Sequence, residues 1–188
     1  MYLFGFGSLI NLSSAQKSFK RVLSQRDLIP VKISGFKRVW NAVESIQFEN
    51  ENQGINGVFL NIKKEENSIL FGVMIEISEE ELEVLKLREK NYSCITIKKE
   101  SVLNFKAEGD LIAFMTTNEE KIAKIGDKNS FIPFKYTQVV KEALKNYDEE
   151  FNKNFEEIFK DYPFSLKEGN YTFTDPIQNK VAREGIKN

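Results

Sequence analysis

The sequence contains no histidine and only one cysteine, Cys94. The absence of histidine excludes Ser-His-Asp and Cys-His nucleophilic sites and zinc sites with histidine ligands. A single cysteine cannot form an internal disulfide, which is typical of a reducing compartment, and we expect Cys94 to be an inert core thiol on a strand. Acid–base chemistry near neutral pH is therefore left to a carboxylate, lysine, tyrosine or the cysteine. A carboxylate is the simplest candidate, because burial alone raises its pKa.

The chain also lacks a charge excess and a long apolar run. It has 27 Lys and Arg against 28 Asp and Glu, so it has no basic surplus of the kind that drives nucleic-acid binding. No segment approaches the roughly 20 apolar residues of a membrane span, and the N-terminal residues do not have the pattern of a secretory signal. We expect a cytoplasmic protein without nucleic-acid or membrane partners. The composition leaves the oligomeric state open.

Length and patterning indicate one domain over residues 1–188, because there is no repeat, linker or break in composition. Alternating large residues predict strands over residues 2–6, 28–41, 92–99 and 111–116. Residues 55–62 and 69–77 predict a hairpin joined by a polar loop at 63–68. The expected fold class is α+β, either a small, mostly antiparallel mixed sheet or a partly closed β-barrel, with flanking helices.

Three helices complete this expectation. Ser13 is expected to cap a short helix that ends near Ser24. Ser78 followed by three glutamates forms a capping box, which predicts a helix ending near residues 88–90. Apolar residues at spacings of three and four predict one amphipathic helix from Tyr136 to about Phe159. Residues from about 148 onward are expected to form a helical extension and tail, for which completing the core is the favoured role.

Three segments are candidates for chemistry, and each is a weak signal when taken alone. The glycine-containing turn at residues 5–9 could expose consecutive backbone N–H groups to an anion, although an ordinary turn is the more frequent explanation. Glu89 follows the capped helix and could point into a cavity rather than into solvent. A carboxylate is disfavoured at a helix C-terminus, which suggests another reason for its presence. Residues 129–136 form only a loop and an aromatic helix start.

In their order along the chain, these segments resemble the motifs of the γ-glutamylcyclotransferase-like superfamily, which includes AIG2-like and ChaC-like proteins. The similar motifs are Phe6-Gly7-Ser8-Leu9 after an aromatic strand, Gly35-Phe36-Lys37-Arg38-Val39-Trp40, the glycine-containing strands around Gly57 and Gly72, Arg88-Glu89-Lys90-Asn91-Tyr92, and a late Ser130 and Tyr136. The resemblance covers about residues 1–147. The first and fourth of these motifs are the most specific.

This resemblance implies a cyclotransferase that converts a γ-glutamyl amine, dipeptide or glutathione-like compound into 5-oxoproline and a free amine. It implies Glu89 as the general acid and base, and a substrate-binding set consisting of Phe6, Gly7, Ser8, Leu9, Tyr92 and Tyr136. No metal or other cofactor is implied. The substrate's own α-amine attacks its γ-carbonyl, so the protein needs no nucleophile of its own.

Several alternatives remain open at this point. One is a related enzyme on the same scaffold, such as a γ-glutamylamine cyclotransferase or a lyase. Another is a non-catalytic binding or regulatory protein for γ-glutamyl-type molecules, and a third is a structural or partner-binding protein. Phe6 stands where the family usually has tyrosine, so the hydroxyl that is missing there bears on activity and specificity.

Overall fold

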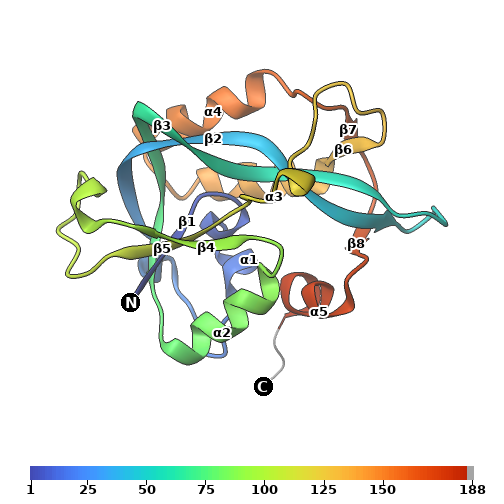
Figure 1. Cartoon of the computed structure of the whole chain (residues 1–188). Coiled ribbons are helices and arrows are strands. Elements are labelled where there is room, and N and C mark those ends of the chain that lie inside the picture. The colour runs from blue at the N-terminus through green and yellow to red at the C-terminus, as the bar shows by residue number, and fades with distance from the viewer. Residues whose placement is uncertain (186–188) are drawn as a thin grey trace.

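The computed structural model describes residues 1–185 and consists of a mixed, strongly twisted sheet with helices on both sides (Figure 1). The strand order is β4-β5-β1-β3-β2-β8, with β6 paired to β3 and β7 to β6. Within the described residues the sheet is open, with β4 and β8 at the two ends of this order, and it is not closed into a barrel. The α+β prediction is confirmed, in its open-sheet form. The strands are β1 (Tyr2–Gly5), β2 (Ile29–Phe48), β3 (Ile55–Glu76), β4 (Ser93–Ile97), β5 (Leu111–Met115), β6 (Ser130–Pro133), β7 (Leu166–Lys167) and β8 (Tyr171–Phe173).

The helices lie in two groups. In Figure 1, α4 lies above the long β2–β3 pair, whereas α1, α2 and α5 lie together below the sheet, near the C-terminus. None of the helices within residues 1–185 is both long and apolar enough to cross a membrane. The helices are α1 (Leu12–Gln16), α2 (Glu79–Arg88), α3 (Phe134–Leu144), α4 (Glu149–Lys160) and α5 (Pro176–Asn179), and α5 continues into a π-helical turn, Lys180–Glu184.

The long β2–β3 pair corrects the predicted hairpin. β3 is one continuous strand that pairs antiparallel with β2, and residues 63–68 belong to it instead of forming a loop. Ser34 pairs with Ile69 and Phe36 with Lys64, so the extra residues of β3 bulge opposite Gly35, whose φ is +84°. The polar run therefore marks a solvent-exposed bulge and not a chain reversal.

The predicted helix over residues 136–159 is also wrong as one element. It is two helices, α3 and α4, because the Asp148 side chain accepts a hydrogen bond from the Phe151 N–H and starts a new helix. The first predicted helix is shorter than expected as well, and its cap is Asn11 instead of Ser13. By contrast, the capping box of α2 is present, with Ser78 and Glu81 bonding each other's backbone N–H groups.

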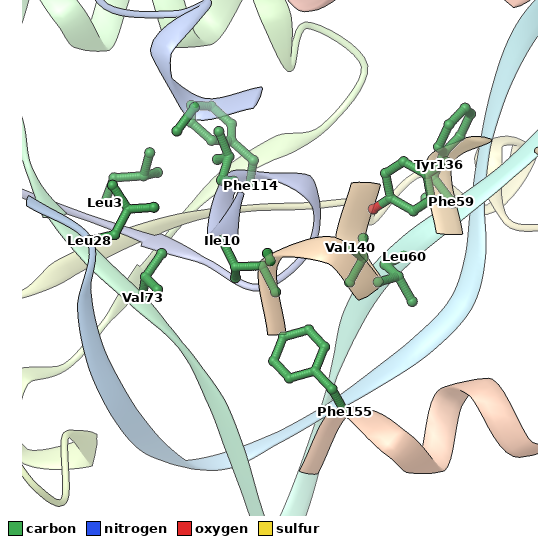
Figure 2. Close-up of a cluster of buried hydrophobic side chains, with 14 of the residues drawn as sticks. Leu3, Ile10, Leu28, Phe59, Leu60, Val73, Phe114, Tyr136, Val140 and Phe155 are labelled. Carbon is green, nitrogen blue, oxygen red and sulfur yellow. The ribbon is translucent and has the colours of Figure 1, made fainter. Parts of the chain in front are cut away.

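The core lies on both faces of the sheet. Along β1, Leu3 packs into a cluster with α1, α3 and α4, whereas its neighbour Phe4 packs into a second cluster on the opposite face. Figure 2 shows part of the first cluster, in which Phe155 from the C-terminal extension lies below Ile10 and Val140. The expectation that Cys94 is a core thiol is wrong, because Cys94 is exposed on β4.

The extension beyond residue 147 contributes to this core. Phe151 and Phe155 are fully buried, and their rings stack at 5.1 Å with an interplanar angle of 15°. β8 then adds to the free edge of β2, where Tyr171 pairs with Phe48. The extension therefore packs against the sheet and adds a strand to it.

Candidate functional site

A cavity of about 250 Å³ lies where the turn after β1, the start of α1, the C-terminal end of α2 and the C-terminal segment meet. The residues that the sequence predicted for catalysis and substrate binding all line this cavity, although they come from three separate parts of the chain. They are Phe6, Gly7, Ser8, Leu9, Glu89, Tyr92 and Tyr136.

The turn after β1 packs closely against Tyr136. Residues Ser8–Ile10 form a single 3₁₀ turn, and a Cβ added at Gly7 would lie 2.6 Å from the Tyr136 hydroxyl oxygen. Only glycine permits that approach without a shift of the tyrosine. Tyr136 is itself held edge-on by Phe59, with ring centroids 5.0 Å apart, and Figure 2 shows the two rings side by side. The tyrosine hydroxyl is thus fixed at the wall of the cavity.

Burial raises the pKa of Tyr136 above its ordinary value, and the backbone N–H groups of Leu60 and Ser8 oppose this rise. The Tyr136 hydroxyl stays protonated near neutral pH and can donate a hydrogen bond to a ligand. The pKa of Tyr92 is also raised, first by burial and then by the nearby carboxylates of Glu44 and Glu89. Both phenols are therefore neutral groups in the cavity.

Glu89 is the C-cap residue of α2, and its side chain is 18% exposed. Burial raises its pKa above the ordinary value, and the charge of Arg88 and a hydrogen bond from it only partly oppose that rise. A carboxylate with a raised pKa is a stronger base than a solvated one and can exchange a proton closer to neutral pH. Glu89 is therefore a carboxylate in the cavity whose proton affinity is raised by burial.

Arg88 connects Glu89 to the turn. Its side chain is 5% exposed, and its Nε donates to Glu89 Oε1 at 3.1 Å while Nη2 donates to Ser8 Oγ at 3.2 Å. Its other hydrogen bonds go to Ser14 and Ser18 of the α1 region, at 2.8–3.2 Å. One guanidinium thus fixes the carboxylate and the turn relative to each other. The sequence motif contains Arg88, but it was not among the predicted site residues.

A second buried arginine holds the other side of the turn. Arg38 is 4% exposed, and its Nε donates to the Phe6 carbonyl oxygen at 2.8 Å while Nη2 donates to the Phe71 carbonyl oxygen. Its guanidinium lies 3.4 Å from the centroid of the Phe155 ring. Burial lowers its pKa to about 9, so the arginine is still charged at neutral pH. Arg38 thus fixes the backbone of the turn at Phe6 and joins it to β3 at Phe71.

Glu44 is a second carboxylate in the cavity, and sequence reasoning missed it. It is 3% exposed and accepts a hydrogen bond from Asn91 Nδ2 at 2.6 Å. Burial raises its pKa to about 7, and the charge of Glu89 adds to that rise. A signal for it existed, because Ala42, Glu44 and Ile46 occupy alternate, inward-facing positions on β2. An acid at an inward position of a strand is unusual enough to mark a site.

The C-terminal segment supplies the remaining wall of the cavity, which the sequence did not indicate. Tyr171 and Phe173 of β8 and Gln178 and Arg183 of the following helical turns line it. Nothing in the pattern of these residues distinguishes them from surface polar and core aromatic positions. Only the folding of the segment back toward α1 and α2 brings them to the site.

The comparisons with known proteins place the chain by its fold. No protein-family model matches the sequence, and no sequence relative was found among curated proteins. Among solved structures, it is similar to a γ-glutamyl cyclotransferase, with 14% identity and a TM-score of 0.58 over 98% of this chain and 99% of that one. It is also similar to a γ-glutamyl cyclotransferase specific to glutathione from yeast, with 15% identity and a TM-score of 0.51 over 85% and 96% of the two chains.

A third structure is YkqA from Bacillus subtilis, with 18% identity and a TM-score of 0.62; the match covers 88% of this chain but 56% of YkqA. Identities this low establish the fold and not the reaction. The fold that the sequence motifs indicated is confirmed. The chain has the fold of the γ-glutamyl cyclotransferases.

Proposed function

We propose that the protein is a γ-glutamyl cyclotransferase, in which Glu89 is the general acid and base for release of 5-oxoproline from a γ-glutamyl compound. The observation that supports this most directly is the pair of hydrogen bonds from buried Arg88 to Glu89 and to Ser8. They hold a carboxylate of raised pKa opposite a turn that can bind the substrate. The fold shared with cyclotransferases supports the same reaction class.

In this reaction the substrate's α-amine attacks its own γ-carbonyl carbon. Glu89 first accepts a proton from the α-ammonium group, which leaves a nucleophilic amine. The new C–N bond closes a five-membered lactam, and protonated Glu89 donates its proton to the leaving nitrogen as the bond to that nitrogen breaks. The Glu89 carboxylate then accepts the second proton that the attacking nitrogen loses, and this proton passes to the released amine, which departs as an ammonium ion. No water is consumed and no covalent enzyme intermediate forms. Holding the flexible γ-glutamyl chain in its cyclisation geometry lowers the barrier further, because less conformational freedom is lost on reaching the transition state.

The other cavity residues have supporting roles in this proposal. Backbone N–H groups of the turn at Gly7, Ser8 and Leu9 bind the substrate's α-carboxylate or the oxyanion that develops on the γ-carbonyl. The neutral hydroxyls of Tyr92 and Tyr136 donate hydrogen bonds to the substrate. Phe6 contributes an apolar wall, and its own side chain is 8% exposed and packs against Phe4.

The test is release of 5-oxoproline from a panel containing glutathione, γ-glutamyl dipeptides and γ-glutamyl amines. We expect the native protein to act on at least one class and Glu89→Gln to be slower by about 10²–10⁴-fold, the range typical of a lost general acid–base group. Glu83→Gln is the matched control, because Glu83 lies on α2 but is exposed and outside the cavity. Unchanged turnover in Glu89→Gln would refute the assigned role of Glu89.

A binding protein for γ-glutamyl-type molecules is the second candidate, and the specific observation in its favour is Phe6. A tyrosine at this position would add a hydroxyl at the cavity wall, and the phenylalanine supplies none. Binding of γ-glutamyl ligands in calorimetry without turnover of any panel member would favour this function. In that case, Phe6→Tyr would show whether the missing hydroxyl accounts for the absence of turnover.

A further inference from the structure

Two cationic side chains line the cavity in addition to Arg88. Lys17 follows the C-terminal end of α1, and Arg183 lies in the π-helical turn after α5. Both line the same cavity as Arg88 and Glu89, and both are partly buried. They come from parts of the chain far apart in sequence, and folding brings them together.

Neither cation has an acidic partner in the part of the chain that the structure describes. The ion pairs within 4.0 Å there include Arg88 with Glu89 and Lys90 with Asp175, but none with Lys17 or Arg183. Burial lowers the pKa of Lys17, and the nearby positive charges of Arg183 and Arg88 lower it further. Clustered like charges without a counter-ion favour the binding of an anion.

The position of Arg183 is fixed by its neighbours. Its guanidinium lies over the Tyr171 ring, 4.4 Å from the centroid, and Tyr171 is 4% exposed in the core. Gly185, just after the turn, packs against Lys17, where an added Cβ would lie 3.6 Å from the lysine Cα. The π-helical backbone at Lys180–Glu184 is a rare form that is frequent at functional sites. Arg183 is therefore held against the Tyr171 ring, and Lys17 lies beside the segment that carries Arg183.

The acidic side chains of the cavity do not offer an equivalent site for a cation. Glu44 is 3% exposed and accepts a hydrogen bond from Asn91, and burial raises its pKa to about 7. It is only partly ionised at neutral pH, and its carboxylate already has a partner. Glu142 lies exposed at the rim. Among the partly buried charges of the cavity, those without an ion-pair partner in the described residues are thus Lys17 and Arg183, and both are positive.

We propose that Lys17 and Arg183 form a second anion-binding subsite in the cavity, which binds a carboxylate on the leaving group of the substrate. This inference rests on the proposed cyclotransferase function. It favours a γ-glutamyl amino acid or peptide, whose leaving group carries a carboxylate, over a γ-glutamyl amine, whose leaving group carries none. It also gives the C-terminal segment a role in substrate choice.

The test is calorimetric binding to the full-length Glu89→Gln protein, whose slow turnover leaves the ligand largely intact during the measurement. The two ligands are γ-glutamylalanine and γ-glutamylalaninamide, which have nearly the same shape and differ in the charge of the leaving group. We expect the carboxylate ligand to bind about tenfold more tightly or better, as one charge-assisted hydrogen bond gives. Equal affinity for the two ligands would overturn the proposal.

Added substitutions then locate the selectivity. Arg183→Gln, made in the Glu89→Gln protein, is expected to bring the affinity ratio close to one. Lys17→Gln is a second variant that leaves the Arg183–Tyr171 contact intact. Lys180→Gln is the matched control, because Lys180 lies on the same helical turn but is exposed and outside the cavity, so the ratio should persist. If Arg183→Gln and Lys17→Gln weaken both ligands equally, the cations bind the α-carboxylate instead and the proposal is wrong.

Turnover distinguishes failure of this inference from failure of the proposed function. The native protein is assayed for 5-oxoproline with the same two compounds. Turnover of both with equal kcat/KM would retain the cyclotransferase and refute the subsite. Selective binding of the carboxylate ligand without turnover would retain the subsite and refute the reaction. Neither binding nor turnover would refute both.

Discussion

Glu44 gives the protein a specific dependence of stability on pH. Its carboxyl group is 3% exposed, and burial raises its pKa from the ordinary 4.5 to about 7. Below pH 4.5 the group is neutral in both the folded and the unfolded chain, so it does not affect stability. Above pH 7 it is ionised in both, and the folded chain must hold the charge out of water. Stability attributable to Glu44 therefore falls as the pH rises from about 4.5 to 7.

The size of this effect follows from the two pKa values. Each tenfold change in proton affinity corresponds to 1.36 kcal/mol, so the full difference is about 3 kcal/mol. Glu44→Gln keeps the shape and can still accept the hydrogen bond from Asn91, but it does not ionise. We expect the variant to gain about 3 kcal/mol of stability relative to the native protein between pH 4.5 and pH 7.5.

The measurement is urea-induced unfolding of both proteins at several pH values from 4 to 8. Other groups titrate as well, so only the difference in unfolding free energy between the two proteins is interpreted. Glu89 and Lys121, whose charges affect the pKa of Glu44, are present in both proteins. Glu83→Gln is the control for loss of one exposed negative charge. A difference between Glu44→Gln and native that does not change with pH, or that favours the native protein as the pH rises, would refute the reasoning.

Two further predictions concern the residues that fix the cavity wall. Gly7→Ala should destabilise the fold by about 1–3 kcal/mol, because the new Cβ meets the Tyr136 hydroxyl at 2.6 Å. In a Tyr136→Phe background, thermal unfolding should show that Gly7→Ala causes a smaller loss of stability. An equal loss of stability in both backgrounds would exclude that contact as the cause. Arg88→Ala should cost about 3–5 kcal/mol in urea unfolding, because it leaves the Glu89 carboxylate partly buried without its partner. Arg88→Lys should lie between Arg88→Ala and native, and a result as stable as native would show that the several hydrogen bonds of the guanidinium are not needed.

Local signals in the sequence predicted part of the fold. The capping box at Ser78 and Glu81 fixes the start of α2 by itself, and therefore places Glu89 at the helix end. The alternation of large residues likewise identified β1, β4 and β5. These features depend on neighbours in sequence, which is why they could be recognised without the structure.

The structure predictions were wrong where pairing between residues far apart in the sequence determines the secondary structure. Residues 63–68 have a loop-like composition, but pairing with β2 keeps the chain extended there. The break before α4 had a local signal in Asp148 followed by two glutamates, which the aromatic spacing of Tyr147, Phe151 and Phe155 concealed. That spacing is real, because the three rings stack across the break.

For the site, the sequence motifs named residues that the structure places on one cavity, and their roles stay predictions. Glu44, Lys17 and Arg183 were missed because their significance depends on what they face. In the sequence, a lysine or arginine in a polar segment is indistinguishable from a solvated side chain. Only the folded structure shows that it lies beside another cation and has no acidic partner among the described residues. Single-sequence reasoning has no access to that neighbourhood.

The cavity is formed by segments that lie far apart along the chain, with residues 5–9 on one side and residues 178–183 on the other. Bringing such distant segments together requires closure of a very long loop, which costs chain entropy. A ligand that contacts both sides would act as a reversible cross-link between them and would stabilise the whole fold in proportion to its occupancy. Hydrogen exchange in the C-terminal segment should therefore slow when the cavity is filled, even at amides that the ligand does not touch.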